Sequence, residues 1–300
     1  MALRLSISFK RRQIIYLISQ LETFITKYQE KPYVSRKKEI DFLCFINVFF
    51  PLTLGAIIVL YYMENFEEVR NEFKPDMLQY FEKHSIQEKI AVLLFTFAYM
   101  LHFYVTSMLC ITMFITIYNT FEDALKQMLV GTYRLLCTDV SAPNLVKASE
   151  LILKVQSMHQ EIENVLSFSI FLVYVLVFVN FLNLVSVNVT NFTSPQLKFR
   201  VFACVIVFLW TTSSFVKLTL TGSKLVDICD LWKLLQQDIV RNCARMKIKN
   251  AKRLTYLLLF LEESKLDLEF TGWGIFRLDR SLLLTIAEAI VSYSVVIATV

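Results

Sequence analysis

The side chains that most often carry out chemistry show no spacing in this sequence that supports catalysis or metal binding. The six cysteines form no C-x-x-C pair, and the three histidines, His84, His102 and His159, lie far apart along the chain. No phosphate-binding loop, dinucleotide-binding glycine motif or nucleophile-elbow motif occurs. We therefore expect neither an enzyme nor a protein that holds a metal or an organic cofactor.

A more informative group of side chains lies near the end of the chain, where it predicts one face of a helix. Spacings of four, three and four residues place four side chains on that face: Glu288, Ser292, Val295 and Thr299. Inserting a carboxylate into a membrane-spanning helix costs about 3 kcal/mol, so Glu288 is expected to face protein or water. The alternative is a protonated carboxyl, or one that reaches the headgroups.

Long uncharged stretches predict the elements that position these residues. The chain is 56% hydrophobic, whereas soluble domains contain about 45–50% apolar residues. About 20 helical residues cross the hydrocarbon core, where the backbone must satisfy its own hydrogen bonds. The sequence therefore predicts an all-α, polytopic membrane protein with five transmembrane helices, at about 42–63, 90–118, 165–187, 200–220 and 282–300.

The distribution of basic residues predicts the orientation of these spans. Most of the 31 Lys and Arg residues fall in segments that alternate spans place on one side: 1–41, 119–164 and 221–281. The positive-inside rule assigns that side to the cytosol. We expect a plasma-membrane protein with a cytoplasmic N-terminus and an extracellular C-terminus. The net charge of +5 is explained by these loops beside anionic lipid, so no nucleic-acid partner is expected.

The same arrangement predicts four domains and one glycosylated loop. The domains are a cytoplasmic N-terminal segment (1–41), a membrane bundle (42–220), a cytoplasmic helical anchor region (221–281) and a final span (282–300). Two N-x-T sequons, at Asn188 and Asn191, fall in a predicted outer loop. They are candidate glycosylation sites, although such tripeptides also occur by chance.

The predicted cytoplasmic segments carry apolar stripes with helical spacing, so they are not disordered loops. We expect the second, third and fourth spans to continue as helices below the membrane. The stripes form either the core of the monomer or an interface between subunits. They comprise Tyr118, Phe121, Leu125, Met128, Thr132 and Leu135; Leu151, Val155, Met158, Ile162 and Val165; and Leu225, Ile228, Trp232, Leu235 and Ile239. The short apolar run 254–261 is interpreted as a buried part of this bundle, or alternatively as a re-entrant or interfacial helix.

The last thirty residues contain a recognisable series of motifs. Phe270-Thr271 comes first, a Leu-Asp-Arg-Ser-Leu-Leu run with Asp279, Arg280 and Ser281 leads into the last span, and Ser292-Tyr293 follows within it. This series resembles the C-terminal signature of arthropod gustatory receptors and their odorant-receptor relatives. In that family Thr-Tyr stands where this chain has Ser292-Tyr293, and the span ends in Gln-Phe rather than Thr299-Val300. The helix layout over residues 40–300 is similar to the same family.

The resemblance implies a tetrameric, ligand-gated, non-selective cation channel with seven spans per subunit, of which this chain shows the last five. Identical or related subunits would assemble through the inner helical extensions. The last span would line the pore with Glu288, Ser292, Val295, Val296 and Thr299. A ring of Glu288 carboxylates attracts cations, and Val295 or Val296 forms an apolar constriction that closes by dewetting.

A ligand pocket is expected in the outer half of the spans. Aromatic side chains with a few polar groups suit a small organic ligand. The candidates are Tyr99, His102, Phe178, Asn180, Asn183 and Trp210. Ordinary helix packing, with Asn bonding a neighbouring helix, is the alternative for each of them.

These observations lead to two hypotheses about function. The first is a gustatory-receptor-like chemoreceptor, a cation-channel subunit that senses small organic tastants. The second is a shortened receptor-like membrane protein that acts as a scaffold or auxiliary subunit without conducting ions, because only five of seven spans are visible.

Overall fold

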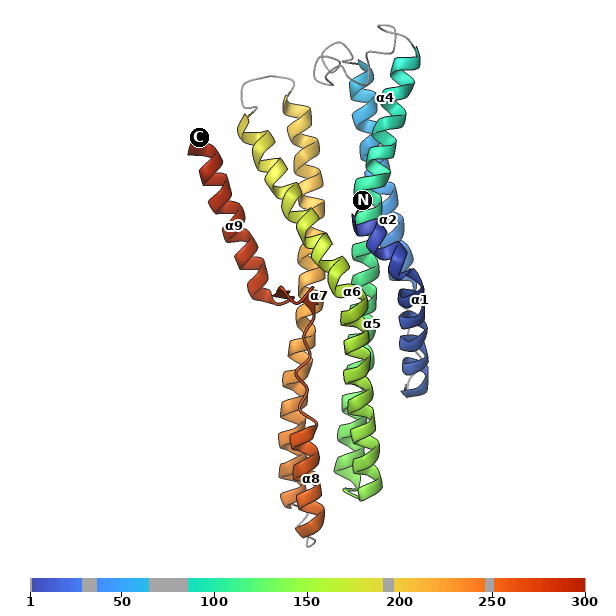
Figure 1. The fold of residues 1–300 in the computed structure, drawn as a ribbon, viewed down its shortest axis with the longest axis vertical. Helices are drawn as coiled ribbons and strands as arrows, with labels where there is room; N and C mark the ends of the chain where they lie inside the picture. The colour runs from blue at the N-terminus through green and yellow to red at the C-terminus, as the bar shows by residue number, and fades with distance from the viewer. Residues whose placement is uncertain (1, 29–36, 65–85, 191–196, 246–250, 300) are drawn as a thin grey trace. The chain divides into compact units, whose positions relative to one another are not determined.

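The chain is mostly helical, as predicted, in a computed structural model that describes residues 2–28, 37–64, 86–190, 197–245 and 251–299 (Figure 1). A six-residue π-helix, η1, and a two-stranded antiparallel hairpin interrupt the α-helices. The elements are α1 (Ala2–Tyr28), α2 (Lys37–Glu64), α4 (Ile86–Tyr99), η1 (Met100–Val105), α5 (Thr106–Thr138), α6 (Ala142–Thr190), α7 (Leu197–Arg245), α8 (Ala251–Glu263), β1 (Thr271–Gly272), β2 (Phe276–Arg277) and α9 (Arg280–Thr299).

Three helices in the described part of the chain are long and apolar enough to cross a membrane: α2, α6 and α7. They contain the first, third and fourth predicted spans. The second predicted span, 90–118, is divided among α4, η1 and α5, and the fifth corresponds to α9. That these last two cross the membrane remains a prediction.

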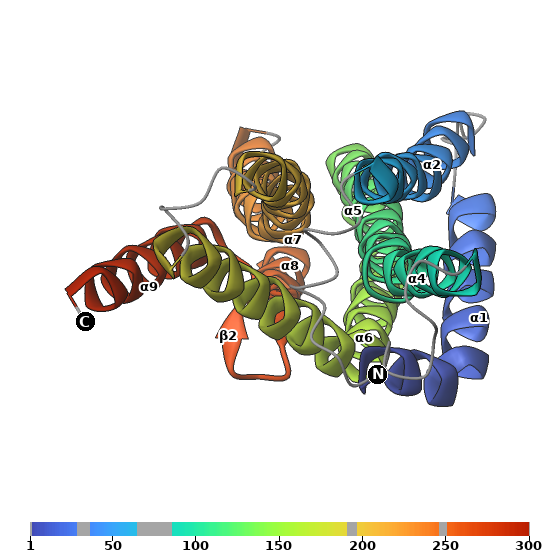
Figure 2. The same cartoon turned by 90° about the horizontal axis from the view of Figure 1, so that it is seen from above.

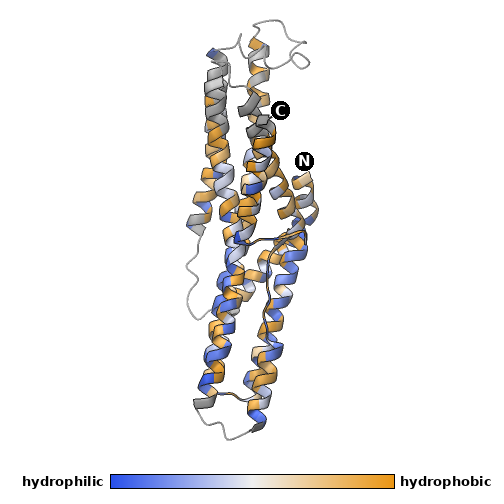
Figure 3. Cartoon of the chain, turned by 90° about the vertical axis from the view of Figure 1, so that its left-hand side faces the viewer, coloured by the Kyte–Doolittle hydropathy of each residue, from blue (hydrophilic) through white to orange (hydrophobic). Residues whose placement is uncertain are grey.

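The helices α6 and α7 are far longer than a bilayer requires. Each has 49 residues, which at 1.5 Å per residue extend about 74 Å, more than twice the thickness of a hydrocarbon core. Hydrophilic residues concentrate in the half of these helices that lies beside α8, and hydrophobic residues dominate beyond it (Figure 3). The predicted helical continuation beyond the apolar runs is therefore confirmed for α5, α6 and α7, and its position on the cytoplasmic side stays a prediction.

The contacts within the chain define two compact units. The first comprises Met1–Val34, Phe114–Val179 and Phe215–Val300, and the second comprises Ser35–Met113 and Asn180–Ser214. The predicted domains are divided by their position in or outside the membrane and not by contacts within the chain. The two units therefore do not test them, and they stay a prediction.

The predicted apolar stripes form the core of the first unit. Leu125 of α5, Val155 and Ile162 of α6, and Trp232 of α7 are completely buried within the single chain. Of the two roles left open for these stripes, the structure shows the core of the monomer.

The helix α8 contributes to this core through one face, as the interpretation of residues 254–261 predicted. Leu257, Phe260 and Leu261 are buried, while Leu258 and Leu259 on the other side are exposed. The buried face packs in one cluster with residues from the ends of three other helices and from the α5–α6 turn: Leu136 of α5, Val140 of the turn, Leu145 and Ala148 of α6, and Ile239 and Cys243 of α7.

The helix α1 was not anticipated in the segment 1–41, where the sequence analysis placed only a cytoplasmic stretch. Its buried residues Ile14, Leu17, Leu21 and Phe24 are spaced three and four apart, which is the pattern of a helix with one apolar face. The Ser6 hydroxyl of α1 forms a hydrogen bond of 2.8 Å with the Ser169 hydroxyl of α6.

Candidate functional site

In the second unit, α2 packs against α4 and η1. The π-helix is a widened stretch of backbone, and the hydroxyl of Thr106, the first residue of α5, donates a hydrogen bond of 3.0 Å to the carbonyl of Leu101 within it. Such insertions occur frequently at functional sites. The side chain of Asn47 on α2 donates a buried hydrogen bond of 2.6 Å to Thr112 of α5, which holds these two helices together.

A small apolar cavity of about 10 Å³ lies in the same unit. It is lined by Phe50, Pro51 and Leu54 of α2, Tyr104 of η1, and Val207 and Trp210 of α7. The Phe50 and Trp210 rings stack with their centroids 4.6 Å apart. The indole N–H of Trp210 is buried and has no hydrogen-bond partner among the described residues. An apolar wall with one unsatisfied donor suits a small organic molecule that carries an acceptor oxygen.

The other predicted pocket residues are distributed differently from Trp210. His102 lies in η1 and Asn180 in α6, both half-buried, and neither lines the cavity. Phe178, also half-buried, belongs to the first unit. The side chains of Tyr99 and Asn183 lie outside the described residues, as do the side chain of Asn188 and the whole of Asn191.

The predicted pore residues lie on the exposed side of α9. This helix is half-buried through Leu282, Leu283, Ile286 and Ile290, whose spacing defines its contact face. Glu288, Ser292 and Val295 are exposed in the single chain, and Val296 beside them is 57% exposed. The side chain of Thr299 is outside the described residues. The described residues of the predicted face are therefore all exposed in the single chain.

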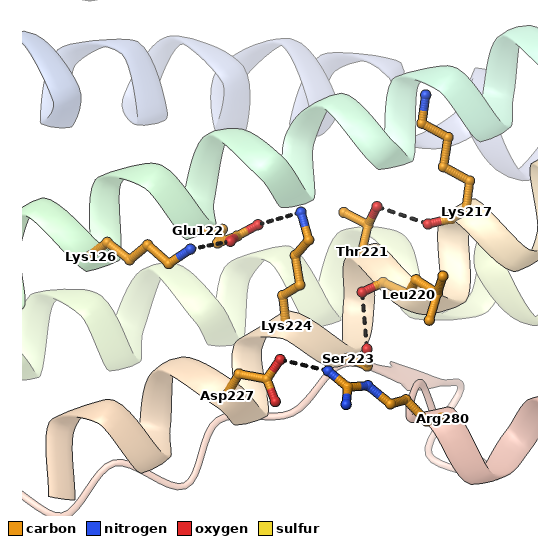
Figure 4. A network of polar contacts seen from close by, with 9 residues as sticks. All are labelled: Glu122, Lys126, Lys217, Leu220, Thr221, Ser223, Lys224, Asp227 and Arg280. Atoms are coloured by element: carbon orange, nitrogen blue, oxygen red, sulfur yellow. Dashed lines mark hydrogen bonds and ion pairs between the residues drawn. The ribbon is translucent and has the colours of Figure 1, made fainter. Parts of the chain in front are cut away.

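The family-motif residues at the start of α9 have a clear structural role. The Asp279 carboxylate accepts hydrogen bonds from the backbone N–H of Leu282 (3.0 Å) and the hydroxyl of Ser281 (2.6 Å), so it caps the helix. The hydrogen bond from Ser281 stabilises the carboxylate and lowers the pKa of Asp279. Arg280 pairs with Asp227 of α7 at 2.9 Å (Figure 4). Tyr293 is 39% exposed on α9.

Glycine at position 222 allows α9 to begin close to α7. A Cβ at Gly222 would lie 2.9 Å from the side chain of Leu278, which is buried just before the capping residue. A larger residue would therefore displace Leu278 and, with it, the beginning of α9.

A second ion-pair network joins α5 to α7 beside this position (Figure 4). Glu122 of α5 is almost fully buried and lies 2.5 Å from the ammonium of Lys126 and 3.4 Å from that of Lys224 on α7. The buried carboxylate has two cationic partners, which is the arrangement that offsets the cost of removing a charge from water.

Residues 264–279, which we call the connector, join α8 to α9 along the surface of α6. Leu266, Leu268 and Phe270 alternate with exposed or half-buried polar residues, so one side of this extended chain is buried. The Phe270 ring stacks on Tyr118 with a centroid separation of 3.8 Å and on His159 at 5.4 Å. Phe270, the first residue of the family signature, is thus a buried attachment point.

Polar groups of α6 bind the connector at successive turns. Gln156 donates to the carbonyl of Lys265 (3.5 Å), His159 Nε2 donates to that of Glu269 (2.9 Å), and the Ser167 carbonyl accepts from Trp273 N (3.1 Å). Because a carbonyl only accepts, the proton of neutral His159 resides on Nε2. Burial lowers the pKa of His159.

Glu163 makes the strongest of these attachments. Its two carboxylate oxygens accept from the backbone N–H of Thr271 (3.0 Å) and from the Thr271 hydroxyl (2.6 Å). Burial raises the pKa of Glu163 despite these bonds. The sequence analysis missed this set, although His159 and Glu163 are four apart, so they share a face of α6, and their polar character was the available signal.

Comparisons with known proteins identify one family and one similar fold. The profile of the 7tm chemosensory receptor family matches residues 2–298. The structure is similar to that of the insect olfactory receptor OR5 from Machilis hrabei, with a TM-score of 0.65, 14% identity, and coverage of 98% of this chain and 76% of that one. It is also similar to the structure of the same receptor in complex with eugenol, with a TM-score of 0.61, 13% identity, and coverage of 97% and 69%. No curated protein sequence matches the chain.

Proposed function

The chain belongs to the 7tm chemosensory receptor family, and from this premise we propose that it is a subunit of a ligand-gated, non-selective cation channel that senses small organic molecules. The family consists of receptors and not of enzymes, in agreement with the sequence analysis. The long apolar helices α2, α6 and α7 of this chain belong to a multi-pass membrane protein.

The observation that carries the proposal is the exposed face of α9. A helix in lipid does not present a carboxylate outward without cost, yet Glu288 is turned away from the residues through which α9 packs. Four copies of this face around an axis surround a water-filled pore, in which the Glu288 ring attracts cations and Val295 or Val296 narrows the passage. The capped and ion-paired start of α9 holds each copy at a defined position.

The second part of the proposal concerns the ligand. The related receptor has been captured with eugenol, a small aromatic molecule, and the cavity beside Trp210 offers apolar walls and one buried donor. At about 10 Å³ the cavity holds no more than a water molecule, so ligand binding requires η1 and the adjoining helices to separate. Movement of this kind is what a gating ligand must produce.

We further assign the chain to the gustatory branch, with the subunits assembled as a homo- or hetero-tetramer in the plasma membrane. The support is the lead-in with Asp279, Arg280 and Ser281, together with Tyr293. The charge distribution supports a cytoplasmic N-terminus and an extracellular C-terminus, with Asn188 and Asn191 as outer glycosylation sites.

The substitution Glu288→Gln tests the pore. The full chain, expressed with and without related subunits, is recorded under voltage clamp during application of sucrose, quinine and eugenol. We expect a reduced single-channel cation conductance and weaker block by polyvalent cations, because the ring loses its charge. Glu262→Gln, at an exposed position of α8, is the matched control and should change neither property. Unchanged conductance and block in Glu288→Gln would refute the pore assignment, and surface expression without any current would favour an auxiliary subunit.

The substitution Trp210→Phe tests the cavity with eugenol as the probe. It keeps an aromatic ring against Phe50 and removes the N–H donor. Loss of one neutral hydrogen bond should raise the half-maximal eugenol concentration about two- to tenfold. The matched control is Tyr256→Phe in the other unit, which removes the hydroxyl donor of a ring that is 57% exposed and should leave the response unchanged. An equal response of the Trp210→Phe variant would place the ligand elsewhere.

A further inference from the structure

The hairpin formed by β1 and β2 carries two exposed apolar side chains at its tip. Trp273 is 56% exposed and Ile275 is 62% exposed, although both lie on a segment that is held to α6 by hydrogen bonds. Figure 2 shows the hairpin projecting from the side of α6. The Trp273 ring contacts the rings of Phe168 and Phe171 on α6, at centroid distances of 5.1 and 5.5 Å. The rest of the indole is presented outward.

The backbone at the tip is strained in order to present this tryptophan. Ile275 N donates to the carbonyl of Gly272 at 3.0 Å, and both residues between them have left-handed φ angles, 53° at Trp273 and 69° at Gly274. Turns of this kind favour Asn, Asp or Gly at the first of these positions, and a bulky residue is an outlier there. The contacts with Phe168 and Phe171 offset part of this strain, and the exposed remainder of the Trp273 side chain is available for a further interaction.

The position of the hairpin along α6 indicates what that interaction is. Glu161 and Glu163 are among the last charged residues of α6, and no charged residue follows in 165–190. Trp273 N bonds the carbonyl of Ser167, directly at this boundary. Exposed tryptophan is enriched where apolar spans meet headgroups, because its ring is apolar and its N–H is polar.

An independently attached group of cations lies at the same level. The ammonium of Lys10 on α1 donates to the carbonyls of Asn164 (2.8 Å) and Val165 (3.1 Å), within one turn of Ser167. Arg11 and Arg12 follow it and are exposed. The basic side chains of the hairpin region are already paired, Arg277 with Glu269 and Arg280 with Asp227. The run at Lys10 therefore supplies the charge that complements anionic headgroups.

We propose that Trp273 and Ile275 insert into the headgroup region of the membrane leaflet that faces Lys10, Arg11 and Arg12, and so attach the connector to the lipid. The inference requires only that α6 is embedded in a bilayer and does not depend on ion conduction. Because the connector leads into α9, the hairpin links the lipid surface to the start of that helix.

Tryptophan fluorescence of the full chain in phosphatidylcholine–phosphatidylglycerol vesicles tests this interaction. The chain has three tryptophans, so the emission of Trp273 is isolated as the difference between the wild type and Trp273→Phe. We expect this difference signal to be quenched by lipids brominated close to the headgroup, less by lipids brominated at the chain end, and little by aqueous iodide. Quenching by iodide alone would place the indole in water. Quenching by neither would show that protein, such as a second copy, covers it. Either result overturns the proposal.

The substitution Trp273→Asn provides a second test in case the phenylalanine variant folds poorly. Asparagine accepts the left-handed backbone, which offsets the loss of the ring contacts with Phe168 and Phe171, so the variant should melt in detergent at about the same temperature as the wild type. In vesicles, the amides of residues 271–277 should exchange hydrogen faster than in the wild type, because the hairpin has lost its attachment. Unchanged exchange in vesicles would contradict the proposal.

Discussion

The connector and α9 are consecutive segments, but the connector is bound closely to the rest of the chain and α9 is largely exposed. Between residues 264 and 279, buried side chains and hydrogen bonds to α6 recur at nearly every turn of that helix. From Leu284 onward α9 is largely exposed, and Leu284 and Val291 are 68% and 62% exposed. The chain therefore fixes where α9 begins, and most of the described surface of this helix is exposed in the single chain. This combination of a fixed start and an exposed face is what the proposed pore role of α9 requires.

The difference between the two segments is tested most strongly by Phe270→Ala. This ring is 2% exposed and stacks on Tyr118, so its removal should lower the free energy of unfolding by about 3–5 kcal/mol. Val291→Ala on α9 is the control and should change it by less than about 0.5 kcal/mol. The measurement is an unfolding titration in mixed detergent micelles. Similar losses for the two variants would show that α9 is as firmly packed as the connector.

The attachment at Glu163 is tested by a pair of variants. Glu163→Ala leaves the N–H and hydroxyl of Thr271 without an acceptor and should lower the free energy of unfolding by about 1–3 kcal/mol. Glu163→Gln keeps one acceptor and should lose less. Hydrogen exchange at Thr271, measured together with the titration, identifies the site. A glutamine variant as unstable as the alanine variant would mean that charge, not hydrogen bonding, holds the connector.

The cap at Asp279 marks the transition between the two segments. Asp279→Ala should destabilise the start of α9 by about 1 kcal/mol, and Asp279→Asn, which retains an acceptor, by much less. The amide of Leu282 should exchange faster in the alanine variant, while amides of α8 remain unaffected. If the amides of α8 exchanged faster by the same factor as the amide of Leu282, the role of Asp279 would not be local.

The smallest expected effect is a pH dependence at His159. Burial lowers its pKa in the folded chain, so below the ordinary value of about 6.5 the unfolded chain binds more protons than the folded one. Its contribution to stability is therefore present at neutral pH and lost as the pH falls through this range. We expect the melting temperature of the wild type to fall on acidification relative to His159→Gln. Burial of Glu163 acts in the opposite direction, because its raised pKa favours the protonated folded form at acidic pH. Parallel melting curves for the wild type and the His159 variant would exclude the effect.

Patterns that repeat along a single helix were predicted well from the sequence. The stripes through Leu125, Val155 and Trp232 are buried as their spacing indicated, and α5, α6 and α7 continue as helices beyond the apolar stretches. The helix α1 was missed even though Ile14, Leu17 and Leu21 carry the same signal. The motif at Asp279 was recognised by resemblance, and the structure supplies its physical role as a cap.

The sequence by itself determined the helical class, the membrane character and the family, because these follow from apolar runs, helical periods and a short motif that are all local in the chain. Only the tertiary structure decided that Glu163 and His159 hold the connector, that Trp210 has an unsatisfied donor beside a cavity, and that Trp273 is strained and exposed. Each of these features depends on contacts between residues that lie far apart in the sequence. Helical periodicity constrains the face of a helix, but it does not specify the partner of that face.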